Sequence, residues 1–226
     1  MHEKEIIYFT EAIQEASQKF YLDAMSKFRI IIDEYPDSDL ADDAMYNIGL
    51  CYYELNQFSK SIDTSKDLIK RYPEATITAL ENSSEFGRTA AKAYYLIVQC
   101  YLGMNNIDEA ENYLIKYIEF DKNNHIAFNN LGNLYLKKNK YKEAEKYYLK
   151  AINLKKDYLP SILNLALYYE GLGNIELAKK FYNKGLKISP KNIGIHFSLS
   201  KIDEKFISEK KIEYIKKLIN SENLDE

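Results

Sequence analysis

The chain has 226 residues, of which 46% are hydrophobic and 29% are charged, an ordinary balance for a soluble protein. Eight Gly and four Pro are too few for a loop-rich or all-β chain of this length. No apolar run approaches the roughly 20 residues that a membrane-spanning helix needs. We therefore expect a helical, cytoplasmic protein, with a periplasmic or envelope location as the alternative if an export signal has been removed.

The net charge of −3 is unevenly distributed along the chain. Residues 1–90 contain nine basic and 17 acidic side chains, a net charge of −8, whereas residues 91–226 contain 22 and 17, a net charge of +5. This asymmetry favours a basic partner at one end or self-association, and a merely solvated surface is the alternative. Arginines are few and lysines alternate with glutamates, so we do not expect nucleic acid to bind.

Residues 1–73 show two successive helix pairs. Apolar side chains over residues 4–34 recur three and four apart, which predicts two amphipathic helices. A Tyr-Pro dipeptide follows at Tyr35–Pro36 and again at Tyr72–Pro73, and each should end a helix because the residue before proline avoids the α region. Two further helices are expected between these dipeptides, joined by a turn at Asn56–Gln57.

Two other stretches are irregular. Residues 74–90 fit no repeat and form an insertion or loop, which is either a plain longer connection or a place where the array bends, divides or carries a special loop. Residues 193–226 begin another first helix and continue into a Lys/Glu-rich segment. That segment suits a terminal capping helix with a frayed tail.

Residues 91–192 have a fixed period. They divide without insertion or deletion into segments 91–124, 125–158 and 159–192, each 34 residues long. Every segment reads as a helix, a short polar turn and a second helix. A sustained period of this length indicates a repeat architecture.

The positions within the period carry a consistent pattern of small and aromatic residues. Small residues stand at the eighth position of most units: Gly49, Val98, Gly132, Ala166 and Ser200. They also stand at the twentieth: Ala24, Ser61, Ala110, Ala144 and Ala178. An aromatic occupies the eleventh: Tyr52, Tyr101, Tyr135 and Tyr169. Small residues opposite large ones are what closely packed antiparallel helices require.

In this pattern the chain resembles the tetratricopeptide repeat (TPR) family. The resemblance implies an all-α, right-handed superhelical solenoid of antiparallel helix pairs, with about five TPR units and a C-terminal capping helix pair. It further implies a non-enzymatic protein–protein interaction scaffold or adaptor that binds a partner peptide or helix in a concave groove lined by the first helices. The alternative is a structural component of a larger assembly, such as one of the cell envelope, that acts through its convex face or by end-to-end stacking.

The same resemblance places candidate groove residues on the first helix of each pair. They are Tyr46, Asn47, Tyr95, Gln99, Asn129, Asn130, Asn133 and Asn164. A row of amides can pair with a peptide backbone whatever its sequence, because each amide offers donors and an acceptor. The alternative is a merely solvated polar row. Cations that would clamp a C-terminal carboxylate are absent from the corresponding positions, which include Tyr95 and Pro160.

Catalytic motifs are absent from the sequence. His2, His125 and His196 are isolated and have no partner at metal-ligand spacing. No Gly-rich phosphate loop or nucleophile motif occurs, so we expect no enzyme, no cofactor and no metal. Cys51 and Cys100 form no CxxC motif and share the tenth position of their repeats, where we expect buried, unreactive side chains.

Overall fold

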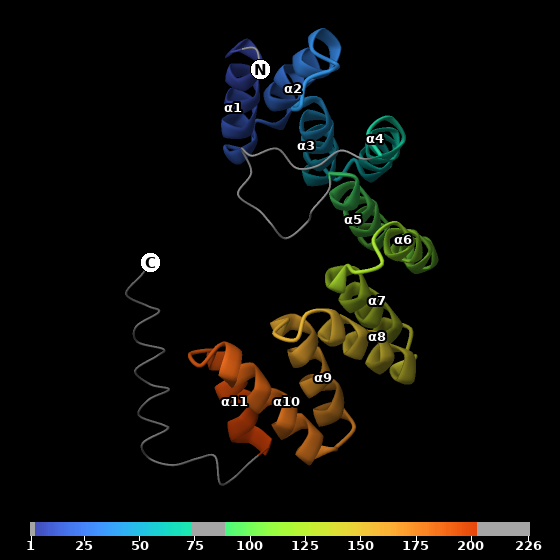
Figure 1. Cartoon of the computed structure of the whole chain (residues 1–226), viewed down its shortest axis with the longest axis vertical. Helices are drawn as coiled ribbons and strands as arrows, with labels where there is room; N and C mark the ends of the chain where they lie inside the picture. The colour runs from blue at the N-terminus through green and yellow to red at the C-terminus, as the bar shows by residue number, and fades with distance from the viewer. Residues whose placement is uncertain (1–2, 74–88, 203–226) are drawn as a thin grey trace. The chain divides into compact units, whose positions relative to one another are not determined.

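The computed structural model describes residues 3–73 and 89–202, and within those ranges all regular structure is helical (Figure 1). The described helices are α1 (Glu3–Ser17), α2 (Tyr21–Glu34), α3 (Ala41–Glu54), α4 (Phe58–Arg71), α5 (Thr89–Gly103), α6 (Ile107–Phe120), α7 (His125–Lys137), α8 (Tyr141–Leu154), α9 (Leu159–Gly171), α10 (Ile175–Ile188) and α11 (Ile193–Ile202). The predicted all-α solenoid of helix pairs is confirmed.

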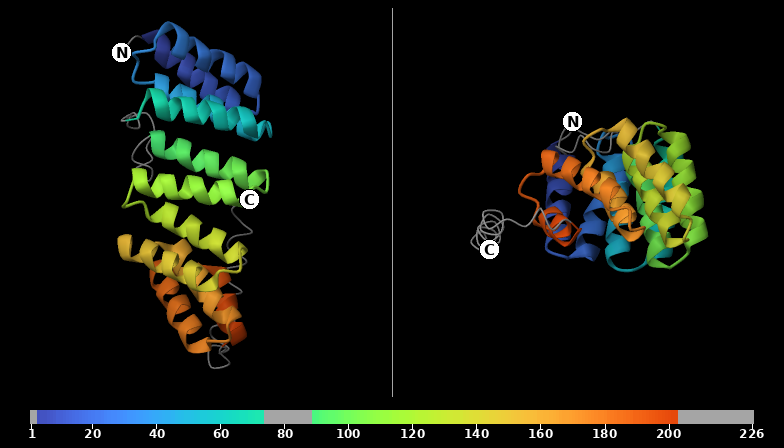
Figure 2. Two further views of the ribbon diagram at one scale, coloured as in Figure 1. Left: turned by 90° about the vertical axis from the view of Figure 1, so that its right-hand side faces the viewer. Right: turned by 90° about the horizontal axis from the view of Figure 1, so that it is seen from below.

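The chain forms two compact units. The N-terminal unit spans Met1–Lys122 and the C-terminal unit spans Asn123–Glu226. Within each unit, consecutive helices pack side by side, as Figure 2 shows for the pairs α1–α2 and α9–α10. Of the predicted insertion at residues 74–90, only Thr89 and Ala90 are described, and they begin α5. The predicted capping helix lies outside the described residues.

The turns inside the helix pairs share one backbone feature. Each contains a residue with positive φ, and four of these residues are not glycine: Lys19 (66°), Asn56 (56°), Asn105 (57°) and Asn139 (57°). Gly173, at 73°, occupies the corresponding place between α9 and α10. Glycine and asparagine tolerate this left-handed conformation better than other residues, which explains their use in these short turns.

The small residues of the repeat allow close contact between the two helices of a pair. All five residues at the twentieth position are fully buried: Ala24, Ser61, Ala110, Ala144 and Ala178. A Cβ atom added to Gly132 of α7 would lie 2.6 Å from the ring of Tyr148 on α8. The ring thus occupies the volume that a larger residue at position 132 would need, and the aromatic side chain is itself fully buried.

The core of each unit consists of these interleaved apolar side chains. In the N-terminal unit, Phe9 and Phe28 meet edge to face with ring centroids 5.6 Å apart. In the C-terminal unit, Tyr148 and Tyr182 pack with aliphatic residues of α9 and α11. Aromatic rings contribute large buried areas, so the many tyrosines serve as core residues in a chain without tryptophan.

Candidate functional site

The predicted groove residues fall into two sets, one in each unit. In the N-terminal unit they lie on the adjacent first helices α3 and α5: Tyr46, Asn47, Tyr95 and Gln99. In the C-terminal unit they lie on α7 and α9: Asn129, Asn130, Asn133 and Asn164.

The C-terminal set contains a hydrogen-bonded group that we call the amide cluster: Asn129, Asn133 and Asn164. The Nδ2 atom of Asn164 donates to Oδ1 of Asn129 over 3.0 Å and to Oδ1 of Asn133 over 2.9 Å. Two core hydroxyls complete the cluster. Ser161 Oγ donates to Asn129 and Tyr148 OH donates to Asn133, each over 2.8 Å. The cluster therefore joins α7, α8 and α9.

These hydrogen bonds determine which amide atoms remain for a ligand. Asn164 uses both of its amide hydrogens inside the protein, which leaves its Oδ1 as an acceptor. Asn133 uses its Oδ1 twice, which leaves its NH₂ group as a donor. Both side chains are half-buried and bonded directly to each other. Their remaining donor and acceptor complement the C=O and N–H groups of an extended peptide.

The other amides contribute less to such a surface than the sequence suggests. Asn129 is only 5% exposed, and its Oδ1 accepts from both Ser161 and Asn164. Asn47 is 7% exposed, and its Nδ2 donates over 2.8 Å to the backbone oxygen of Asp43 on its own helix. The Nδ2 atom of Asn130 is buried. Asn47 and Asn129 therefore offer little exposed surface to a ligand, and their amides form hydrogen bonds within the fold.

The remaining predicted residues of the N-terminal unit form a mixed aromatic and polar surface. Tyr46 packs on the cluster of Ile62 and Leu96, with the Nζ atom of buried Lys92 5.3 Å from its ring centroid. Tyr95 and Gln99 are half-buried. The cation–π contact of Lys92 was not visible in the sequence, because residues 46 and 92 meet only when α3 and α5 pack together.

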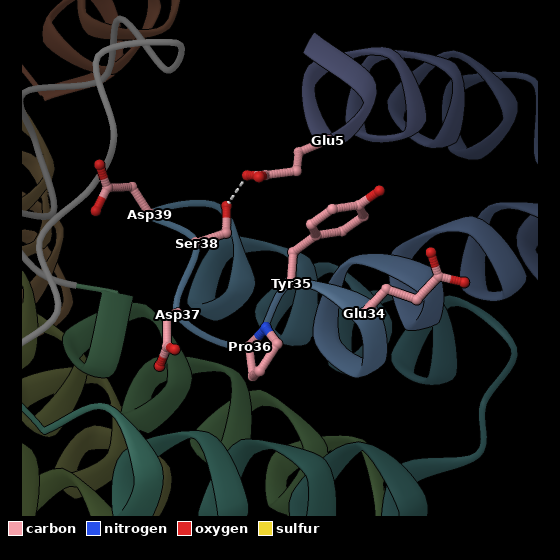
Figure 3. A pocket seen from close by; sticks show the side chains of 7 residues that line it. All are labelled: Glu5, Glu34, Tyr35, Pro36, Asp37, Ser38 and Asp39. Atoms are coloured by element: carbon pink, nitrogen blue, oxygen red, sulfur yellow. Dashed lines mark hydrogen bonds between the residues drawn. The ribbon is translucent and has the colours of Figure 1, made fainter. Parts of the chain in front are cut away.

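The N-terminal unit also contains an acidic cavity of about 350 Å³ that the sequence patterns did not predict (Figure 3). Its lining residues are Glu5, Glu34, Tyr35, Pro36, Asp37, Ser38 and Asp39. Glu5 is 3% exposed and accepts a hydrogen bond from Ser38 Oγ. In the described part of the chain none of the four carboxylates forms an ion pair. The sequence hint was the acidic stretch that follows the first Tyr-Pro dipeptide.

Neither cysteine is arranged for nucleophilic chemistry. Cys51 and Cys100 are buried, as predicted, and burial raises the pKa of the Cys51 thiol to about 11. Burial also raises the pKa of Cys100. Both thiols are therefore protonated at neutral pH, in the less reactive state.

His196 is a core residue. Its side chain is buried, and its Nε2 lies 2.8 Å from the backbone oxygen of Pro190. Among residues 3–73 and 89–202, no group of three or more His, Cys, Asp or Glu side chains could hold a metal ion. Over the same ranges, no helix has both the length and the apolar character needed to cross a membrane.

Models of the tetratricopeptide repeat match four stretches of the sequence: residues 43–75, 91–124, 125–158 and 159–192. Together these cover 135 residues, more than half of the chain. Among curated proteins, none matches the sequence.

Several solved structures share the fold. MamA is 19% identical over 84% of this chain and 94% of its own, with a TM-score of 0.57. YrrB, described as a TPR protein with an unusual peptide-binding site, is 16% identical over 88% and 94%, with a TM-score of 0.55. A tetratricopeptide repeat protein from Parabacteroides merdae is 11% identical over 97% and 80%, with a TM-score of 0.64. At these identities the similarity establishes the fold alone.

Proposed function

Because the chain belongs to the tetratricopeptide repeat family, we propose that it is a protein–protein interaction scaffold that binds an extended partner segment at the amide cluster. The observation that carries this proposal is the pairing of Asn133 and Asn164. Beyond the hydrogen bond that joins them, the NH₂ group of Asn133 remains as a donor and Oδ1 of Asn164 remains as an acceptor. A peptide in extended conformation offers the matching acceptor and donor on its backbone.

An apolar residue lies beside this polar pair on the same helix. Leu167 stands three residues after Asn164 on α9, and so on the same side of the helix, and is 55% exposed. Leu163, one residue before Asn164, is partly buried against the core of the C-terminal unit. The amide pair would fix the backbone of a bound segment, and Leu167 would contact an apolar side chain of it. YrrB, which shares the fold, is itself a peptide-binding TPR protein by its description.

The test replaces the NH₂ group of Asn133 by an oxygen atom. In Asn133→Asp the carboxylate still accepts the hydrogen bonds of Tyr148 and Asn164, but the donor that we assign to the ligand is lost. The probe is a displayed library of random linear peptides, selected on the wild-type protein. We expect the enriched peptides to bind Asn133→Asp about tenfold more weakly, which corresponds to about 1.4 kcal/mol.

Asn153→Asp is the matched control. It makes the same chemical change on the exposed side of α8, where the side chain of Asn153 forms no hydrogen bond among the described residues. This variant should bind the selected peptides as the wild type does. Equal weakening of both variants, or a library that yields no enriched peptide, would rule out the amide pair as the binding site.

A second candidate function is structural: the protein would be a component of a larger assembly held together by contacts outside the groove. The opposite charges of the two units favour this candidate, because complementary surfaces can join copies end to end.

A further inference from the structure

The outer side of α8 carries a row of lysines. Lys142, Lys146 and Lys150 are four residues apart, all exposed, and hence on one face of the helix. We call this row the lysine stripe. Within the described ranges none of the three forms an ion pair. Like charges at this spacing repel one another, so the stripe slightly destabilises its own helix. A surface of this kind favours an anionic partner.

Neighbouring aromatic side chains contact two lysines of the stripe, Lys146 and Lys150, without neutralising them. The Nζ atom of Lys150 lies 5.3 Å from the ring centroid of Phe128 and 5.5 Å from that of Tyr147. Lys146 lies 5.9 Å from the same tyrosine. Of the two glutamates of α8, Glu145 already accepts a hydrogen bond from Tyr169 OH. Leu149, on the same helix and 38% exposed, adds an apolar contact surface beside the lysines.

The N-terminal unit has the complementary surface. Glu34, Asp37 and Asp39 are exposed at the rim of the acidic cavity, and in the described part of the chain none has a cationic partner (Figure 3). We call these three residues the acidic rim. Described residues 3–73 carry eight basic and 14 acidic side chains, whereas described residues 123–202 carry 14 lysines and five acidic side chains. The acidic rim thus lies in a region with an excess of acidic side chains, and the lysine stripe lies in a region with an excess of lysines.

We propose that the lysine stripe on α8 binds the acidic rim of a second copy of this chain. The stripe and the rim are different surfaces, so the contact is heterologous: in a pair of copies, one copy keeps its rim available and the other keeps its stripe. Such a contact propagates into chains of copies, or closes into a ring if the geometry allows. The proposal assigns contact residues to the second candidate function, the role in a larger assembly. It does not depend on peptide binding at the amide cluster.

The test is sedimentation velocity of the full chain over a range of concentrations, at low and at high salt. We expect association at low salt that weakens with added salt, because exposed charge pairs are screened. Reversing the stripe with Lys142→Glu, Lys146→Glu and Lys150→Glu should raise the dissociation constant about tenfold or more. The control reverses three lysines of α10, with Lys180→Glu, Lys184→Glu and Lys187→Glu, and should leave association unchanged.

A second experiment mixes two variants with opposite charge reversals, so that misfolding of one variant cannot be mistaken for loss of the contact. The rim variant Glu34→Lys, Asp37→Lys and Asp39→Lys should be as monomeric as the stripe variant, since each then carries two surfaces of like charge. Mixing the two variants should restore association, because each again meets an opposite charge. Three outcomes would overturn the proposal: a wild-type monomer at every concentration, equal loss in the α10 control, or a mixture that stays monomeric. The Asn133→Asp variant should assemble normally, which separates this result from the groove.

Discussion

At the scale of single residues, Gly132 lies directly against the ring of Tyr148. The ring atoms lie 2.6 Å from where a Cβ atom of residue 132 would be, and the ring is fully buried and held by its hydrogen bond to Asn133. We predict that Gly132→Ala lowers the free energy of unfolding by about 1–3 kcal/mol, because the ring must move within a packed core. Urea denaturation followed by circular dichroism measures the change.

Gly171 provides the control for this prediction. It lies at the end of α9, where an added Cβ would meet no atom within 4 Å. Gly171→Ala should therefore be neutral or slightly stabilising, since alanine favours the helix over glycine by roughly 1 kcal/mol. A Gly132→Ala protein as stable as the Gly171→Ala protein would show that α7 and α8 separate at little cost.

Residue patterns allowed the packing of each helix pair to be predicted, but not the hydrogen bonds of the amides. Gly132 lies against the buried ring of Tyr148 and Ala144 is fully buried, so both positions require small residues, and that constraint is visible in sequence. The atoms that Asn129, Asn133 and Asn164 leave free depend on contacts between successive repeats. These contacts involve the buried hydroxyls of Ser161 and Tyr148, and no sequence pattern indicates that these hydroxyls reach the amides.

At the scale of helices and turns, most boundaries were predictable and one group of contacts was not. Tyr35–Pro36 ends α2 and Tyr72–Pro73 follows α4, as the restriction on residues before proline requires. The acidic cavity could not be foreseen, because it forms where the loop after α2 approaches Glu5 of α1. The acidic residues that neighbour one another after α2 were evident in the sequence. Their proximity to the buried carboxylate of Glu5 on α1 was not.

The turn between α1 and α2 contains a residue that is poorly suited to its backbone conformation. Lys19 has a φ of 66°, and its side chain is exposed. A residue with a Cβ atom is strained there by roughly 1–2 kcal/mol. Lys19→Gly removes this strain but increases the entropy of the unfolded chain. We predict a net stabilisation of about 0.5–1 kcal/mol, measured by urea denaturation.

The corresponding change at Asn56 tests this explanation. Asn56 has a φ of 56° in the turn between α3 and α4, and asparagine already tolerates the left-handed region. Asn56→Gly should therefore change stability by less than Lys19→Gly does. If both variants gained stability equally, strain at Lys19 would not be the cause.

At the scale of the whole molecule, the division into two units predicts how far a local perturbation extends. In repeat proteins each repeat contacts its neighbours only, so stability is approximately a sum of local and nearest-neighbour contributions. The contacts of Gly132 and the amide cluster all lie within the C-terminal unit. Loosening α7 against α8 should therefore leave the distant helices of the N-terminal unit as stable as before.

We predict that Gly132→Ala lowers amide hydrogen-exchange protection in α7, α8 and α9 and leaves α1 to α4 unchanged. A loss of about 1–3 kcal/mol corresponds to a fall in protection of roughly fivefold to 150-fold, provided that exchange follows opening equilibria. Hydrogen exchange resolved by mass spectrometry distinguishes the units peptide by peptide. A uniform fall from α1 to α11 would instead mean that the two units unfold together, because a single cooperative transition transmits the destabilisation of one helix pair to every other.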